Sequence, residues 1–210
     1  MVKKQPPSAR PFIPEHAGLK ELAEAARHCE GCDLYLHATQ TVFGEGKKSA
    51  RIMLVGEQPG DQEDRAGAPF VGPAGKILDQ ALEEAGIDRT TVYVTNAVKH
   101  FRFEERGKRR IHKKPSGVNI SACRPWLEAE IEHVKPETIL CLGATAAQSL
   151  AGREVRVLQD RGKWIPTILA KRLMVTIHPS ALLRLPETAS YEDEYSHFVA
   201  DLRRATEAVS

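Results

Sequence analysis

Four short polar stretches of the sequence carry side chains that could do chemistry. Gly56-Glu-Gln-Pro-Gly60, Asn96-Ala-Val-Lys-His100 and His178-Pro-Ser-Ala-Leu-Leu-Arg184 each follow a compact apolar run, and a basic stretch spans residues 106–114. Carboxylate, amide and imidazole groups gathered in one place could polarise, deprotonate or attack a reacting group. A polar residue at a strand end is more often a turn or cap, with odds of about two in three. Three polar strand ends on the same edge of one sheet instead favour a functional site.

The cysteines indicate a second kind of chemistry. Cys29, Cys32, Cys123 and Cys141 are too few and too unevenly spaced for a secreted disulfide framework. The two residues between Cys29 and Cys32 let both thiolates reach one metal. Cys141 lies in the apolar run Ile139-Leu-Cys-Leu142, where a free cysteine is usually a small hydrophobe, with odds of about four in five.

Alternating strand and helix patterns must position these stretches. Short apolar runs predict buried strands at residues 51–56, 92–95, 138–143 and 172–177. Helical spacing predicts helices at residues 19–28, 77–85, 120–134, 144–150 and 191–208. We therefore expect an α/β fold, a single domain with a central four-stranded parallel sheet flanked by helices. Ligands of such sheets bind beyond the carboxyl ends of the strands.

The bulk composition sets few further limits. The 210 residues, 41% of them hydrophobic, suit one domain, expected at residues 16–210 after a flexible, disordered or draped arm at residues 1–15. The formal charge of +2 neither demands nor excludes a polyanionic partner. No apolar run approaches the roughly 20 residues that cross a bilayer. We expect a cytoplasmic monomer with no membrane partner.

The polar stretches resemble the motifs of a known family. GEQPGD with PFVGPAG, the TNAVKH stretch and the HPSALLR stretch resemble the iron–sulfur uracil-DNA glycosylases, across residues 25–205. GEQPG in place of the commoner GEGPG, and the added KRRIH at residues 108–112, resemble the UdgX branch of this superfamily, which is similar to family four. The resemblance implies the uracil-DNA glycosylase fold, base flipping and uracil-containing DNA as partner, with nucleoid association when bound.

The resemblance also implies a covalent step. In the UdgX branch the histidine of the KRRIH loop bonds to the abasic sugar that remains after uracil excision, and here that residue is His112. Glycosidic cleavage places positive charge on the sugar and negative charge on the departing base. Glu57 and His178 are suitable residue types for these charges. With Gln58, which the resemblance suggests positions uracil or the attacking group, they complete the expected catalytic set.

We expect uracil to be recognised by a set of residues that partly overlaps the catalytic set. Asn96 offers both a donor and an acceptor, which can read the imide edge of uracil and reject the reversed pattern of cytosine. Phe70 could stack on the flipped base. From the residues alone, its packing beneath the loop as a core side chain has roughly even odds. Gln58 and His178 complete the expected uracil-binding set.

The basic stretch favours DNA binding. Six of the nine residues from 106 to 114 are Lys or Arg, and such a positive insertion beside the site would draw the DNA backbone toward it. Cations beside His112 should lower its pKa and leave a neutral imidazole able to attack a sugar carbon. Arg110 could steady the loop by pairing with a carboxylate or a phosphate. The expected DNA-binding residues are Lys108, Arg109, Arg110, Lys113 and Arg184.

The resemblance extends the metal site. Related glycosylases have a cysteine directly after the Asn-x-x-Lys stretch, and this chain has His100 there. Histidine can replace cysteine on iron in some clusters. The expected ligands of a structural [4Fe-4S] cluster are Cys29, Cys32, His100 and Cys123. Zinc stays open as the alternative, since three cysteines and one histidine form a common zinc site.

Three other functions stay open. In an ordinary multiple-turnover uracil-DNA glycosylase, Glu57 or a neighbour would activate water and His112 would only contact phosphate. The protein could also be a non-catalytic binder of uracil-containing DNA. A nucleotide-binding protein has odds below about one in ten, because GEQPG lacks the glycine pattern of phosphate-binding loops. Single-stranded DNA is the expected preferred partner. Residues 182–184 could wedge into the base stack, but a buried helix turn would have the same sequence pattern.

Overall fold

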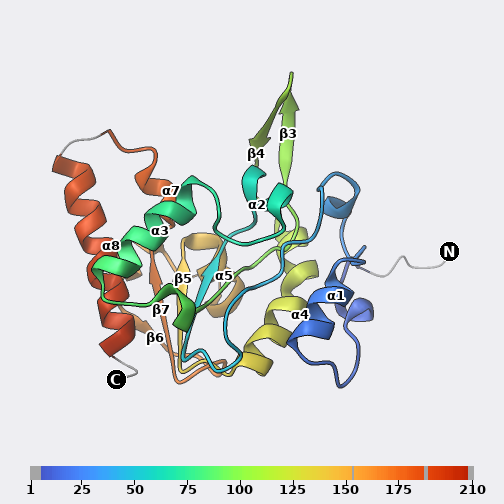
Figure 1. Ribbon diagram of the computed structural model, residues 1–210, viewed down its shortest axis with the longest axis horizontal. Coiled ribbons are helices and arrows are strands. Elements are labelled where there is room, and N and C mark those ends of the chain that lie inside the picture. The colour runs from blue at the N-terminus through green and yellow to red at the C-terminus, as the bar shows by residue number, and fades with distance from the viewer. Residues whose placement is uncertain (1–5, 153, 187–188, 208–210) are drawn as a thin grey trace.

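The fold is built on a five-stranded sheet with strand order β2-β1-β5-β7-β6 (Figure 1). The computed structural model describes residues 6–152, 154–186 and 189–207. The strands of this sheet are β1 (Ile52–Gly56), β2 (Tyr93–Asn96), β5 (Thr138–Leu142), β6 (Trp164–Ile165) and β7 (Arg172–Thr176). The pairs β2–β1, β1–β5 and β5–β7 are parallel, so the expected α/β fold and its four parallel strands are confirmed.

The fifth strand corrects the expectation of a four-stranded sheet. β6 pairs with β7 in the antiparallel direction at the edge of the sheet. It contains only two residues, and two residues are too few to show the alternation by which a strand is recognised.

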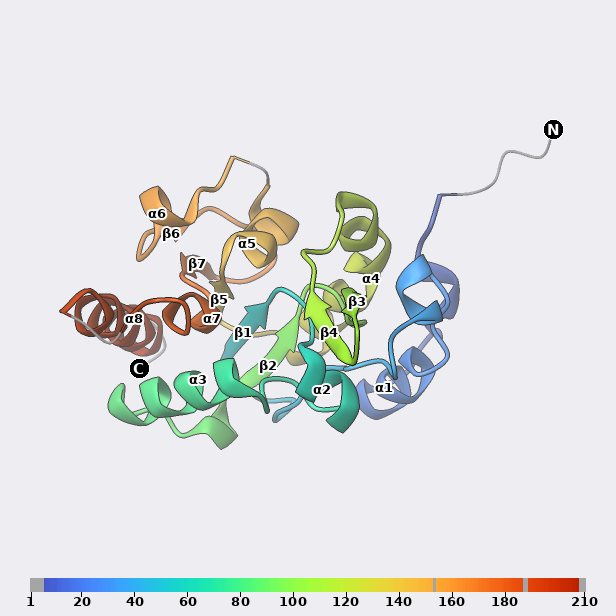
Figure 2. The same cartoon turned by 90° about the horizontal axis from the view of Figure 1, so that it is seen from above.

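Helices cover both faces of the sheet (Figure 2). One core cluster joins the sheet to α3, α7 and α8, and another joins it to α4 and α5. The helices are α1 (Leu19–Ala26), α2 (Asp61–Ala66), α3 (Pro73–Glu84), α4 (Gly117–Val134), α5 (Ala144–Ala151), α6 (Val157–Asp160), α7 (Pro179–Leu182) and α8 (Ala189–Glu207), with 3-10 turns η1 (Arg10–Phe12), η2 (Asp33–Leu36) and η3 (Arg89–Thr91). None of the helices among the described residues is long and apolar enough to span a membrane.

The basic stretch forms a β-hairpin that projects from the body, where the sequence had indicated an aperiodic loop (Figure 1). β3 (Phe103–Arg106) and β4 (Arg109–His112) pair in the antiparallel direction and turn at Gly107, whose φ is 61°. Most of their side chains are exposed, so charge stands on both faces and no alternation of apolar residues marks the strands.

The expected arm lies partly against the body. Residues 1–5 fall outside the described residues. Ala9 is buried, and its N–H donates to the carbonyl oxygen of Ala122 in α4 at 2.7 Å. The described part of this segment is therefore draped over α4, beside α1 and the buried cysteines.

Candidate active site

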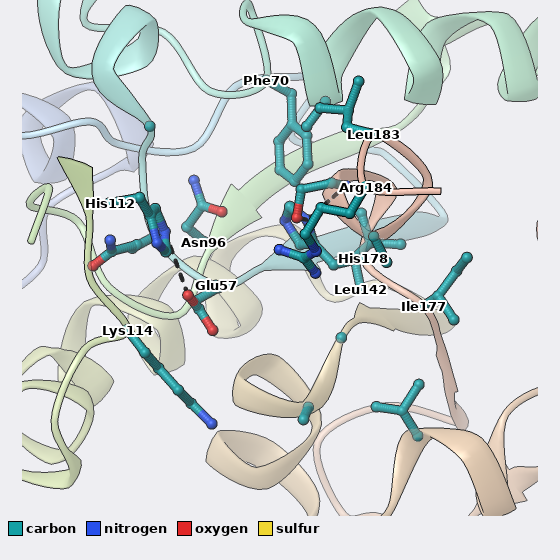
Figure 3. A pocket seen from close by; sticks show the side chains of 18 of the residues that line it. Glu57, Phe70, Asn96, His112, Lys114, Leu142, Ile177, His178, Leu183 and Arg184 are labelled. Atoms are coloured by element: carbon teal, nitrogen blue, oxygen red, sulfur yellow. Dashed lines mark hydrogen bonds and ion pairs between the residues drawn. The ribbon is translucent and has the colours of Figure 1, made fainter. Parts of the chain in front are cut away.

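A pocket of about 800 Å³ opens at the carboxyl ends of the parallel strands. The three polar stretches meet there: Glu57 follows β1, Asn96 ends β2 and His178 follows β7. Figure 3 shows these side chains around the same pocket. The other expected site residues that line the pocket are Gln58, Phe70, His112 and Arg184. The rule for parallel sheets therefore located the pocket from the sequence.

Asn96 presents an unpaired amide oxygen to this pocket. Its side chain is 2% exposed, and its Oδ1 atom has no hydrogen-bond partner. Buried polar atoms are almost always hydrogen-bonded, so an orphaned oxygen in a pocket indicates a place for a ligand donor. Gly56 makes room for this arrangement, since a Cβ there would lie 2.3 Å from Asn96 Oδ1 and 2.6 Å from Phe70 Cζ.

Phe70 is held in a backbone conformation that non-glycine residues rarely adopt, with φ of 57°. Its ring stacks on the His178 ring, with centroids 5.8 Å apart and planes inclined by 29°. The ring belongs to the core cluster of α3 and also lines the pocket. It is therefore a core side chain, as one expectation had it, and it also lies where the other expectation requires a ring that could stack on a base. Such local strain is typical of functional sites.

His178 is a neutral hydrogen-bond donor. The backbone N–H of Ser180 donates to its Nδ1 at 3.1 Å, so in the neutral ring the hydrogen is on Nε2. Burial lowers the pKa of His178 to about 4, and electrostatic interactions with His112 and Arg184 add to this shift. The imidazole can therefore donate through Nε2 without carrying a charge.

Glu57 lies between His112 and a residue that the sequence did not indicate, Thr145. Its Oε1 is 3.5 Å from His112 Nε2 (Figure 3), and its Oε2 accepts a hydrogen bond from the Thr145 hydroxyl. Thr145 lies in the first turn of α5 and is 2% exposed. No motif marked it, because a threonine at a helix start is ordinarily a capping residue.

His112 lies at the end of β4 and is directed at the pocket although about half of its side chain is exposed. Burial lowers its pKa; the Glu57 carboxylate opposes this shift and the Arg184 guanidinium adds to it. The expected direction of the pKa shift is thus confirmed, but burial and Arg184 cause it in place of the neighbouring residues of the basic stretch. The imidazole retains a lone pair near neutral pH.

Gln58 is fully engaged with the base of the hairpin. Its Nε2 donates to the carbonyl oxygens of Arg102 at 3.1 Å and Lys113 at 3.0 Å, and its Oε1 accepts from the Arg102 N–H at 3.2 Å. The two amide hydrogens are therefore already used by backbone oxygens. In this arrangement Gln58 holds the strand that carries His112.

Arg110 joins the hairpin to α2. Its guanidinium donates to Asp61 at 2.5 Å and to Asp64 at 2.6 Å, and it lies over the rings of Phe101 and Phe103. Its side chain is only 13% exposed. Of the two expectations for Arg110, the structure has it paired with carboxylates.

The other expected DNA-binding cations are spread over the hairpin and the pocket rim. Lys108 and Arg109 stand at the exposed tip of the hairpin, whereas Lys113 pairs with Glu104 at 2.5 Å. Arg184 lines the pocket, as does Lys114 at the end of the basic stretch, which was not among the expected DNA-binding residues. Lys114 is exposed and extends beside the pocket floor below Glu57 in the view of Figure 3.

The expected metal ligands surround a second, small cavity. Cys29, Cys32, His100 and Cys123 are all buried and line it, whereas Cys141 lies inside the sheet core on β5. Burial raises the pKa of Cys123 to about 12 and also raises the pKa of Cys32. A positively charged metal centre would stabilise these thiolates. Among the described residues, no three histidine, cysteine or carboxylate side chains converge tightly enough to hold a single ion.

His100 is a neutral imidazole with one ring nitrogen free to bind a metal. The Thr41 hydroxyl donates to the Ala26 carbonyl oxygen at 2.7 Å, so it accepts from His100 Nε2 at 3.0 Å. Burial lowers the pKa of His100 to about 4, which keeps the ring neutral. The hydrogen is then on Nε2 and the lone pair is on Nδ1. The donor set therefore fits a metal cluster held by three thiolates and one imidazole.

An amide with an unpaired oxygen, a neutral imidazole, an aromatic ring and a carboxylate surround one pocket, and these groups could hold a flat polar ring beside a group that becomes positively charged. This chain belongs to the uracil-DNA glycosylase superfamily, whose family model matches residues 43–203.

The names of similar proteins agree with this membership. The type-4 uracil-DNA glycosylase of Thermotoga maritima is 39% identical over 164 residues, which are 78% of this chain and 82% of the relative. The enzyme of the same name from Pyrobaculum aerophilum is 37% identical over 175 residues, or 80% and 86% of the two chains. That from Sulfurisphaera tokodaii is 33% identical over 184 residues, or 84% and 80%.

Proposed function

We propose that this protein excises uracil from DNA and that His112 then bonds to the abasic sugar, which makes it a uracil-DNA glycosylase of the UdgX type. The observation that carries the proposal is the position of His112, on a projecting hairpin, with its Nε2 3.5 Å from the Glu57 carboxylate inside the pocket. A neutral imidazole placed there is a nucleophile at the same site as the groups suited to hold uracil.

The base is held and stabilised by three side chains. Asn96 Oδ1 lacks a partner and can accept from the N3–H of uracil, while its amide hydrogens can donate to a carbonyl oxygen of the base. His178 donates through Nε2 to the base as negative charge develops on it. Phe70 provides a ring against which the base can stack.

The sugar is attacked on the side of Glu57 and His112. The bond between C1′ and N1 of uracil breaks, and its electron pair leaves with the base. The carboxylate of Glu57 stabilises the positive charge on the sugar. In the neutral tautomer of His112 with its hydrogen on Nδ1, the lone pair of Nε2 forms the new bond to C1′. The imidazolium that results loses its Nδ1 proton to water, which balances the proton that the uracil anion takes from water.

The experiment that tests this proposal resolves the protein and a single-stranded uracil-containing oligonucleotide on a denaturing gel. We expect a heat-stable shifted band with the unaltered protein and none with His112→Ala. Duplex DNA run in parallel tests the expected preference for single strands. A band that persists in His112→Ala would overturn the assignment of the attacking residue.

An ordinary turnover glycosylase is the second candidate, because the relatives described above bear the name type-4 uracil-DNA glycosylase. Glu57 would then direct a water molecule to C1′, and His112 would contact the backbone. Free uracil released in many equivalents per protein, with no shifted band, would establish this function. Release of no uracil would instead favour a non-catalytic binder.

We also propose that Cys29, Cys32, His100 and Cys123 hold a [4Fe-4S] cluster. The support is their shared burial around one cavity and the neutral His100 ring with its lone pair on Nδ1. When bound, the cluster supplies a covalent tie between distant segments. Cys29 follows α1, His100 leads into the hairpin and Cys123 lies in α4, so the tie would hold the base of the hairpin in place.

A further inference from the structure

The active-site pocket extends beyond the groups that hold uracil. Its volume of about 800 Å³ lies in the range of pockets that enclose ligands of several rings. Figure 3 shows Glu57, Asn96 and His112 on one side of the pocket and Ile177 on the opposite side, with His178 and Arg184 between them. Apolar residues on the side of Ile177 form the apolar end of the pocket. One pyrimidine with its sugar therefore leaves the apolar end unfilled.

α6 contributes Val157 and Leu158 to the pocket lining. Val157 is partly buried and packs against both core clusters, which anchors the helix. The next residue, Leu158, also lines the pocket, but it is 85% exposed. A large apolar side chain that is anchored at its base and open to solvent at a pocket mouth is available for a ligand.

Among the described residues that line the pocket, few large apolar side chains are exposed to solvent. Seven large hydrophobic residues are exposed among the described residues, and of these only Leu158 and Leu183 line the pocket. They come from different elements, α6 and the end of α7, so two separate apolar contacts flank one opening. Isolated exposed leucines elsewhere need no explanation, but a leucine at the mouth of a base-binding pocket does.

We propose that Leu158 and the apolar end of the pocket form a subsite for the nucleobase next to the uracil in the DNA strand. The inference rests on the proposed function, because a flipped uracil brings the neighbouring nucleotide to the mouth of the same pocket. Apolar side chains, leucine included, contact the faces and edges of unstacked bases. The exposed cation Arg156, which precedes α6, suits the phosphate beside such a base.

The test measures binding without chemistry. An oligonucleotide with 2′-fluoro-deoxyuridine resists cleavage, because fluorine disfavours positive charge on the sugar, so its dissociation constant can be measured at equilibrium. We expect Leu158→Ser to weaken binding by about fivefold, the order expected when one aliphatic side chain loses its contact with a base. Ile168→Ser is the matched control, since Ile168 is 102% exposed and does not line the pocket.

A second pair of oligonucleotides identifies the contact. In one, the base on the 5′ side of the uracil is removed; in the other, the base on the 3′ side is removed. We expect one of the two removals to weaken binding of the unaltered protein and to have no further effect on Leu158→Ser. The subsite would be overturned if base removal weakened binding equally in the unaltered protein and in Leu158→Ser. It would also be overturned if Ile168→Ser bound the intact oligonucleotide as weakly as Leu158→Ser does.

Two outcomes separate this inference from its alternatives. If the unaltered protein elutes as a dimer and Leu158→Ser as a monomer, the leucine contacts a second copy and the subsite is overturned. If ordinary deoxyuridine DNA yields neither free uracil nor a shifted band, the proposed function fails. The subsite also fails if the binding measurements show no coupling between Leu158 and a neighbouring base, whether or not uracil is excised.

Discussion

The hydroxyl of Thr145 donates to one carboxylate oxygen of Glu57, while the other oxygen of Glu57 faces His112 Nε2 at 3.5 Å. The two contacts fix the carboxylate between them. Thr145 is buried at the start of α5, so its position is set by the sheet and not by the hairpin. The hairpin therefore brings His112 to a carboxylate that the body of the protein has already oriented.

Replacing Thr145 by valine should slow capture of DNA without weakening its binding. Valine keeps the shape but cannot donate, so Glu57 loses the contact that orients it. We expect the single-turnover rate of adduct formation to fall about tenfold, the usual scale for loss of a hydrogen bond to a charged group. Thr145→Ser should restore most of the rate.

The two variants distinguish orientation from simple packing. Thermal melting and the dissociation constant for 2′-fluoro-deoxyuridine DNA should match the unaltered protein in both. If Thr145→Ser is as slow as Thr145→Val, the hydroxyl does not act on Glu57 and the side chain matters only for packing.

The pH dependence of capture should reflect a histidine with a lowered pKa. Burial and Arg184 lower the pKa of His112 below its ordinary 6.5, and Glu57 opposes this only in part. The lone pair is thus free above the lowered pKa and is lost as the pH falls through it. The single-turnover rate should be flat from about pH 6.5 upward and should decline only at more acid pH.

Arg184→Gln provides the internal comparison for this pH profile. Removing that cation takes away one cause of the shift, so the midpoint should move to higher pH. His178, with a pKa of about 4, stays neutral throughout this range. A midpoint above 6.5 in the unaltered protein would show that Glu57 dominates and that His112 is protonated at neutral pH.

Gln58→Ala should reduce adduct formation more than uracil release. The amide of Gln58 makes three hydrogen bonds to the backbone at the base of the hairpin, so its loss should loosen the strand that carries His112. We expect about a tenfold lower adduct yield at equal times, with free uracil little changed. Parallel losses of both products would indicate that Gln58 acts on the base.

Several pocket residues could be predicted from the sequence, because each lies at the end of a strand that a short apolar run marks clearly. These residues are Glu57, Asn96 and His178. The carboxyl ends of parallel strands meet at one edge of the sheet, so their side chains come together there. The hairpin could not be predicted, since its exposed strands have no apolar face. Thr145 and Leu158 were missed because a helix-start threonine and a leucine in a helix give no local sign of the pocket they face.

Cluster assembly should distinguish Cys123 from Cys141. Cys123 lies with Cys29, Cys32 and His100 around one small cavity, whereas Cys141 is buried in the sheet core away from it. We expect Cys123→Ala to lose iron, sulfide and brown colour, and Cys141→Ala to retain all three. Since histidine ligation raises the potential of a cluster, His100→Cys should retain iron but show a lower reduction potential. Iron loss in a well-folded Cys141→Ala protein, or a colourless unaltered protein with stoichiometric zinc, would contradict this ligand set.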